Sequence, residues 1–335
     1  MIRAGDVVEI RSQDEILRTL DANGRLDGLP FMPEMLKLCG QRFRVYRRAE
    51  KTCDTITASG ARRMRDAVHL EGVRCGGEAH GGCQASCLLF WKEAWLRPAA
   101  DAAAAPECFD SRPPVCSEAD LARATRGSSV PDSTERFACQ ATELLGATSA
   151  LPWWDVRQYA REIRSGNVGL GRMLAVVTRA AVRALCRRIP GAPSPYIRGL
   201  LKGRTPSLRL DLRPDELVQV KSREEIARTL DADSRNRGLY FDVEMLPYCG
   251  RTFRVVRRVE RLIEERTGRM ITLPNDCVVL DGVACSGELS RRRLFCPRSI
   301  QPFWREIWLR RVPVPGGCAG PVGAVATLDA SQPDG

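Results

Sequence analysis

The sequence predicts an α+β protein in which one small β-barrel module, of the SH3-like kind, occurs twice. Three observations lead to this class. Residues 11–48 align with residues 221–258 at a constant offset of 210, and 22 of the 38 positions are identical. Each copy contains short runs of alternating apolar residues, which are typical of half-buried strands. The stretch between the copies has helical periodicity instead. A generic α+β sandwich is the alternative architecture.

Composition and periodicity divide the chain into five predicted segments. They are a first module at 1–97, a flexible Ala/Pro/Ser-rich linker at 98–136, a basic helical insert at 137–204, a second module at 205–312 and a disordered tail at 313–335.

Each module is predicted to open with a strand, at residues 6–10 and 216–220, followed by a short helix. The helix is expected because Ser12 and Glu15 have the S-x-x-E spacing of a capping box, which the second copy repeats. Further strands are predicted at 43–47, 67–73 and 88–96, with counterparts near residues 253, 278 and 303. The predicted core tryptophans are Trp91, Trp95, Trp304 and Trp308.

The insert carries most of the excess charge of the chain. Residues 137–204 contain 11 Lys plus Arg against 3 Asp plus Glu, within a total formal charge of +11. A helix is predicted at 170–188, with four arginines on one side. They are Arg172, Arg179, Arg183 and Arg187. Such a stripe suits an anionic partner, which can be an acidic protein, a nucleic acid, a membrane surface or a phosphorylated metabolite, and a solvated helix face explains it equally well.

Fourteen cysteines raise the question of redox compartment. The N-terminus lacks the apolar core of a signal peptide, so a cytoplasmic location with reduced thiols is predicted rather than a disulfide framework. No apolar run reaches the length of about 18 residues that a membrane span requires.

The loop from Cys75 to Cys87 contains the candidate chemistry. It reads C-x4-H-x2-C-x3-C over Cys75, His80, Cys83 and Cys87, with four glycines between the ligands. Zinc takes such ligands in a tetrahedron, and a Cys3His set also suits iron or an iron–sulfur cluster. Only two histidines occur in the chain, so one inside the cysteine run favours a metal site over a merely crowded loop. Cys53 is a fifth candidate; if it ligates, His80 becomes available as a proton carrier.

The second copy departs from the first at this loop. It keeps Cys285 and Cys296 but has isoleucine opposite Cys87 and Cys53. Loss of the metal is the simpler interpretation, and the alternative is a second site formed by Cys277, Cys285 and Cys296.

Three stretches, at 29–35, 80–83 and 303–309, read LPFMPEM, HGGC and FWREIWL. Together they resemble an uncharacterised bacterial Cys-rich family with a duplicated small-barrel module. The family has no settled activity, so the resemblance implies no catalytic residue.

Three function classes follow. The first is a cytoplasmic metalloprotein with a Cys3His site, either an enzyme or an accessory protein in the biosynthetic modification of small molecules or peptides. The second is a nucleic-acid-binding adaptor with a structural zinc loop, and the third is a protein–protein scaffold. The sequence contains no nucleophile elbow, P-loop or dinucleotide fingerprint, so it leaves open whether the protein is an enzyme.

Overall fold

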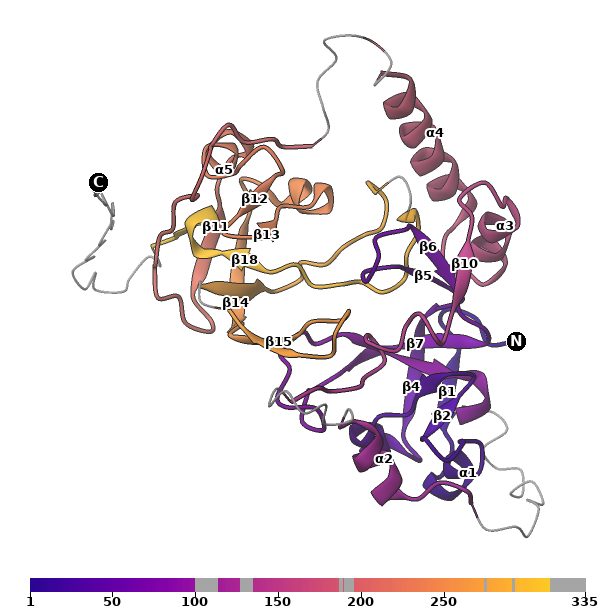
Figure 1. Cartoon of the computed structure of the whole chain (residues 1–335). Coiled ribbons are helices and arrows are strands. Elements are labelled where there is room, and N and C mark those ends of the chain that lie inside the picture. Colours follow the sequence, from indigo (N-terminus) through magenta and orange to yellow (C-terminus); the bar gives the residue numbers. More distant parts are fainter. Residues whose placement is uncertain are drawn as a thin grey trace. The chain divides into compact units, whose positions relative to one another are not determined.

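A computed structural model describes residues 1–99, 114–126, 135–186, 189, 196–273, 276–290 and 293–313. The chain forms two compact units (Figure 1). The first comprises Met1–Leu185, Arg261–Ile271 and Ser286–Ile300, and the second comprises Cys186–Glu260, Thr272–Cys285 and Gln301–Gly335. Two segments of the second repeat therefore belong to the first unit. Much of the predicted linker, Arg187 and nearly all of the predicted tail lie outside the described residues.

Each repeat builds an antiparallel five-stranded sheet. The strands of the first are β1 (Val7–Ile10), β4 (Arg42–Arg48), β7 (Ala67–Arg74), β8 (Leu88–Lys92) and β9 (Leu96–Pro98). Those of the second are β11 (Leu217–Val220), β14 (Thr252–Arg258), β17 (Cys277–Leu280), β18 (Trp304–Arg305) and β19 (Leu309–Arg311). The spatial orders, β8-β7-β4-β1-β9 and β18-β17-β14-β11-β19, are equivalent. The prediction of an α+β protein with a duplicated β module is thus confirmed.

Shorter elements complete the two repeats and the insert. In the first half they are α1 (Gln13–Leu17), β2 (Arg25–Leu26), β3 (Leu29–Pro30), η1 (Pro33–Leu38), β5 (Lys51–Cys53), β6 (Ala61–Arg63), η2 (Glu93–Trp95), α2 (Glu118–Ala124), β10 (Ser149–Leu151), α3 (Arg157–Arg164) and α4 (Leu170–Cys186). In the second half they are α5 (Arg223–Ala227), β12 (Arg235–Asn236), β13 (Leu239–Tyr240), η4 (Val243–Tyr248), β15 (Arg261–Ile263), β16 (Met270–Thr272) and η6 (Glu306–Trp308). Helix α2 lies inside the stretch predicted as a linker, and its Leu121 is buried in the first core.

The capping boxes start the helices as predicted. The backbone N–H of Ser12 donates to Glu15 Oε2 at 2.7 Å, and the corresponding bond from Ser222 to Glu225 is 2.9 Å. Because the same local sequence satisfies the same free amides, α1 and α5 begin at equivalent positions.

Aromatic packing fills both sheet cores. Phe31 packs edge-on against Trp91 and Trp95, at ring-centroid distances of 6.1 and 5.1 Å. In the second repeat Phe241 makes the same contacts with its two tryptophans, at 6.0 and 5.2 Å. All four tryptophans are fully buried, which confirms that they belong to the core.

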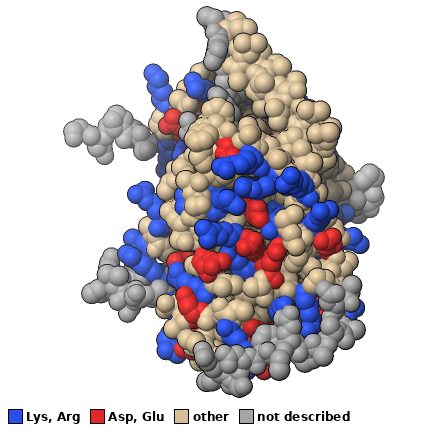
Figure 2. Space-filling model, turned by 90° about the vertical axis from the view of Figure 1, so that its right-hand side faces the viewer, with Lys and Arg blue, Asp and Glu red and all other residues tan. Residues whose placement is uncertain are grey.

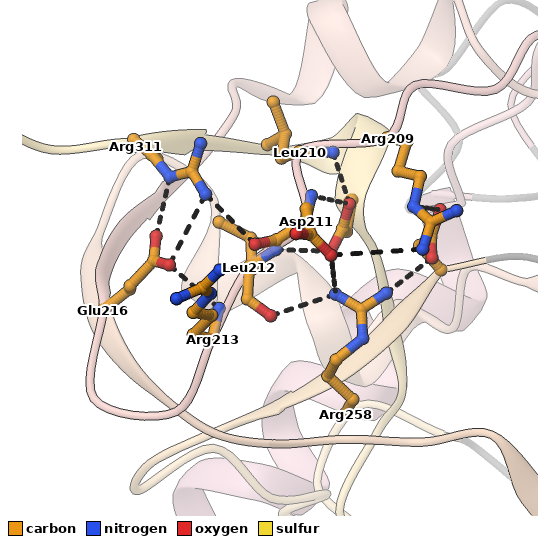
Figure 3. Close-up of polar contacts among 10 residues, drawn as sticks. Arg209, Leu210, Asp211, Leu212, Arg213, Glu216, Arg258 and Arg311 are labelled. Atoms are coloured by element: carbon orange, nitrogen blue, oxygen red, sulfur yellow. Dashed lines mark hydrogen bonds and ion pairs between the residues drawn. The ribbon is translucent and has the colours of Figure 1, made fainter. Parts of the chain in front are cut away.

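A buried carboxylate secures the second sheet. Glu306 has no exposed surface and accepts hydrogen bonds from the backbone amides of Asp211 and Leu212, both at 2.9 Å. It also accepts hydrogen bonds from the backbone amide of Leu210 and from Arg258, the latter at 2.8 Å. Figure 3 shows Arg258 reaching from its strand toward Asp211 and Leu212. The ion pair of Glu306 and Arg258 leaves neither charge without a partner. Together with the backbone amides that donate to Glu306, it ties the segment before β11 to the sheet.

The segment predicted as the insert contains the helices α3 and α4 and also the strand β10. Met173 and Val176 of α4 pack against Phe295. Arg172 and Arg179 of the predicted stripe form ion pairs with Glu288, so two of its members have a carboxylate partner within the first unit. Figure 2 shows Lys and Arg side chains interspersed with Asp and Glu on one face of the molecule. Within the described part of the chain, no helix is long and apolar enough to cross a bilayer.

Candidate metal centre

The loop between β7 and β8 folds tightly around two glycines. The backbone N–H groups of His80 and Gly82 both donate to the carbonyl oxygen of Gly77, at 3.2 and 2.9 Å. Gly77 has a φ of +77°, and a Cβ there would lie 2.1 Å from the carbonyl oxygen of Cys83. At Gly81, with a φ of +71°, a Cβ would meet the ring of Phe137 at 2.6 Å. These contacts leave room only for glycine, and they turn His80 inward.

Three donor atoms meet beside this loop. Glu34 of η1, Cys75 at the end of β7 and His80 of the loop place one oxygen, one sulfur and one nitrogen within 4.8 Å of one another. Cys75 Sγ lies 3.4 Å from Glu34 Oε1 and 3.3 Å from His80 Nε2. His80 Nδ1 lies 3.7 Å from Glu34 Oε1. Oxygen, sulfur and nitrogen donors of this kind are the ones that zinc accepts.

Two of the donor groups carry buried atoms without a hydrogen-bond partner. Among the described residues, neither His80 Nδ1 nor Glu34 Oε2 is paired, although both atoms are shielded from solvent. Leaving a buried polar atom unpaired costs about 1 to 3 kcal/mol. A bound cation would satisfy the carboxylate and organise the imidazole, so the residues present fit a metal ion.

The protonation states of the site fit the same interpretation. Burial, and then the neighbouring Glu34 carboxylate, raise the pKa of Cys75 far above its usual range. Burial lowers the pKa of His80, so its ring is neutral. The Cys75 thiol therefore donates a proton toward Glu34, and a thiolate there needs a compensating positive charge. A divalent cation would supply that charge and displace the proton.

A cavity of about 40 Å³ adjoins two of the three donors, Cys75 and His80. Cys75, His80, Cys83 and Cys87 all line it, so the structure brings the four predicted ligands to one place. Cys83 and Cys87 do not belong to the close group of three donors, and their ligation stays a prediction. Cys139 also lines the cavity, and burial raises the pKa of its thiol to about 12. This volume has room for an ion with a small ligand.

Cys83 and the remaining cysteine candidates each have further contacts. Cys83 Sγ accepts a hydrogen bond from the backbone N–H of Ile263, at 3.4 Å. Cys53 lies against Cys296 in the first unit. In the second unit, Cys277 accepts a hydrogen bond from Arg305 at 3.2 Å. Cys285, another predicted member of the second site, is half-buried and belongs to the second unit.

Glu34 is the donor that the spacing argument missed. The sequence signal of the site consists of cysteines and histidine, because these residues cluster in one loop. With 41 acidic residues in the chain, a single carboxylate carries no such signal. Glu34 is half-buried, and its counterpart in the second repeat, Glu244, is buried.

The fold and the site together define a class: an α+β protein with a duplicated antiparallel β module and one candidate metal centre in its first half. Comparison with protein-family models, curated proteins and solved structures finds no match for the chain. The assignment of function therefore depends on the geometry of the site.

Proposed function

We propose that the protein is a metalloprotein that holds one divalent cation through Glu34, Cys75 and His80. The observation that carries the proposal is the convergence of three different donors from η1 and the β7–β8 loop, two of them with unpaired buried atoms. A metal site requires several donor atoms that point to one place, and a bound cation would give these buried atoms the partner that they lack.

Zinc is the cation we favour. One sulfur, one nitrogen and one oxygen match the mixed donor sets of zinc proteins, whereas iron–sulfur clusters are held chiefly by several thiolates. With three protein donors, a fourth position remains for water or substrate, which is the pattern of catalytic rather than closed structural zinc. The adjoining cavity supports an open fourth position.

On this proposal the protein is an enzyme or an accessory protein in the modification of a small molecule or peptide. A bound cation would polarise a substrate oxygen or activate a water molecule. Glu34, Cys75 and His80 would fix its position, and the apolar lining residues Met32 and Phe90 would limit access of bulk water.

Several broader features are proposed with it. Each five-stranded sheet is an SH3-like small barrel, the protein works in the cytoplasm, and it belongs to the bacterial Cys-rich family that its motifs resemble. The arginines of α4 contact an anionic partner, such as an acidic protein, a nucleic acid or a phosphorylated metabolite. Retention on heparin that weakens steeply with salt is the expected result for such a partner.

Cobalt substitution tests the number of thiolate ligands. The Co²⁺-loaded protein should show sulfur-to-cobalt charge-transfer absorption that Cys75→Ala removes. If Cys83→Ala and Cys87→Ala keep that absorption, the fourth position is open; if either removes it, the site is closed and structural. Cys186→Ala, an exposed thiol on α4, is the control for loss of a cysteine.

His80→Ala separates structure from chemistry. A structural ion predicts that the melting temperature falls as the metal leaves. An open catalytic site predicts weakened metal binding with the fold retained, because the sheet core does not include His80. A variant that keeps full metal content would remove His80 from the ligand set.

A further inference from the structure

A second thiol site lies in the first unit, apart from the three metal donors. Cys53, the last residue of β5, is only 2% exposed, and Cys296, from a segment of the second repeat, is 4% exposed. The two thiols form a hydrogen bond with each other and are not joined as a disulfide. They are 243 positions apart in sequence, so the fold alone brings them together.

A buried arginine supports this pair. Arg298 donates hydrogen bonds to the carbonyl oxygen of Cys53 at 3.2 Å and to Thr55 Oγ1 at 2.9 Å. The neighbouring Cys296 thiol and the charge of Arg298 lower the pKa of Cys53, against the effect of burial. A thiolate with a positive neighbour is the reactive form of cysteine.

Positively charged groups lie around the pair. Arg298 is 4% exposed and lies beside the thiols, and the buried amine of Lys51 also lies near Cys296. Arg298 also pairs with Glu265 at 3.6 Å and lines the cavity beside Cys75 and His80. These positive charges stabilise the negative charge of a thiolate. The pair differs from the group of Glu34, Cys75 and His80 in its chemistry, because it offers two sulfurs and no carboxylate or imidazole.

The contact between Cys53 and Cys296 has an equivalent contact between their repeat counterparts, and only the first contains two thiols. The repeat counterpart of Cys53 is Ile263, and that of Cys296 is Cys83. In the equivalent contact the backbone N–H of Ile263 donates to Cys83 Sγ. Only one of the two equivalent contacts can thus become a covalent link.

We propose that Cys53 and Cys296 form an oxidisable dithiol that hydrogen peroxide converts to a disulfide, linking β5 to the segment Ser286–Ile300. The Cys53 thiolate attacks one peroxide oxygen; an S–O bond forms, the O–O bond breaks, and the departing hydroxide takes a proton to become water. Cys296, as its thiolate, then attacks the Cys53 sulfur; the S–S bond forms, the S–O bond breaks, and a second water leaves. The two thiols lose two electrons, and the peroxide gains them.

Peptide mapping of the intact wild-type protein tests this proposal. The protein is treated with hydrogen peroxide, alkylated after unfolding, and digested without reductant. The expected result is a reducible cross-linked peptide pair containing Cys53 and Cys296, with the loss of two alkylatable thiols. Cys83 is the matched internal control. Its partner in the equivalent contact, Ile263, has no thiol, so Cys83 should remain alkylatable after peroxide treatment.

Two variants sharpen the test. In Cys53→Ser, Cys296 should remain alkylatable after peroxide, and in Arg298→Met the cross-link should form more slowly than in the wild type. Recovery of Cys53 and Cys296 as separate alkylated or sulfonated peptides from the wild type would overturn the proposal. The wild-type map decides the matter even where a variant fails to fold.

Discussion

The two repeats share a fold but not a site. Both have the same strand order, the same capping box and the same pair of tryptophans around one phenylalanine. They differ in the loop between the third and fourth strands of the sheet. The first has His80 there, while no histidine follows it in the chain. The fold therefore depends on residues that both copies keep, and the candidate metal site depends on a loop whose histidine the second copy lacks.

The differing loops occupy equivalent places. Gly77 and Gly287 both have positive φ, +77° and +69°, and a Cβ at either would clash with the backbone of Cys83 or Cys296. The second loop thus keeps the turn that shapes the first, and it keeps Cys285 opposite Cys75. It lacks the imidazole and has isoleucine opposite Cys87.

The largest expected effect comes from the carboxylate that secures each sheet. Glu306→Ala should destabilise the second unit by about 3 to 5 kcal/mol, because it leaves the backbone amides of residues 210–212 without their buried acceptor and removes one carboxylate partner of Arg258. The counterpart Glu93→Ala should cost less, since the Glu93 side chain is 24% exposed against 0% for Glu306. Urea denaturation of both variants measures the difference. Equal losses of unfolding free energy in the two variants would contradict the difference in burial between Glu306 and Glu93.

Substitution of the turn glycines separates fold from site. Gly77→Ala and Gly287→Ala should each destabilise the protein by about 2 to 3 kcal/mol, because both force a Cβ into backbone at positive φ. Only Gly77→Ala should also weaken metal binding, since it displaces the loop that carries His80. Calorimetry and metal titration of both variants check this. Equal loss of metal from both would contradict the assignment of the site to the first repeat.

The insert, which has no counterpart in the second repeat, should give the protein a distinct pH dependence. Burial raises the pKa of Glu162 in α3 to about 7 from its ordinary value of 4.5. The folded state therefore holds a proton that the unfolded state releases, so stability should fall as pH rises from 4.5 to about 7. Glu162→Gln should remove this decline, which is about 3 kcal/mol. Urea midpoints across this pH range provide the measurement, and an unchanged slope in Glu162→Gln would refute the assignment.

The smallest effect is expected at the surface of α4. Arg172→Ala and Arg179→Ala should each change stability by less than about 1 kcal/mol, since their side chains are 59% and 56% exposed. If the arginines contact an anionic partner, the double variant should lose heparin retention at low salt while keeping its melting temperature. Unchanged retention would remove these two arginines from any such surface.

The fold was predictable from sequence because it depends on local patterns. Alternating apolar residues, the S-x-x-E caps and the internal repeat each act over a few residues, and the repeat supplies every signal twice. What the sequence could not show is that Arg261–Ile271 and Ser286–Ile300 join the first unit. That arrangement depends on long-range contacts, such as Ile263 with Cys83, which leave no periodic trace.

The site was predictable only in part. Spacing and scarcity located the loop and its inward histidine, and four predicted ligands line one cavity. Glu34 approaches from η1, 41 residues before Cys75 in sequence, and only the tertiary structure places it there. The proximity of Cys53 to Cys296 was likewise invisible, because the two lie in different repeats.

Elemental analysis of three purified proteins, prepared side by side without oxygen, tests the central claim most directly. Wild-type protein and Cys285→Ala should each contain one equivalent of metal per chain, while Glu34→Gln should contain much less. Cys285→Ala removes the repeat counterpart of a ligand and leaves Glu34, Cys75 and His80 in place. A metal-free wild type that is fully folded, or a Glu34→Gln protein with full metal content, would contradict the account.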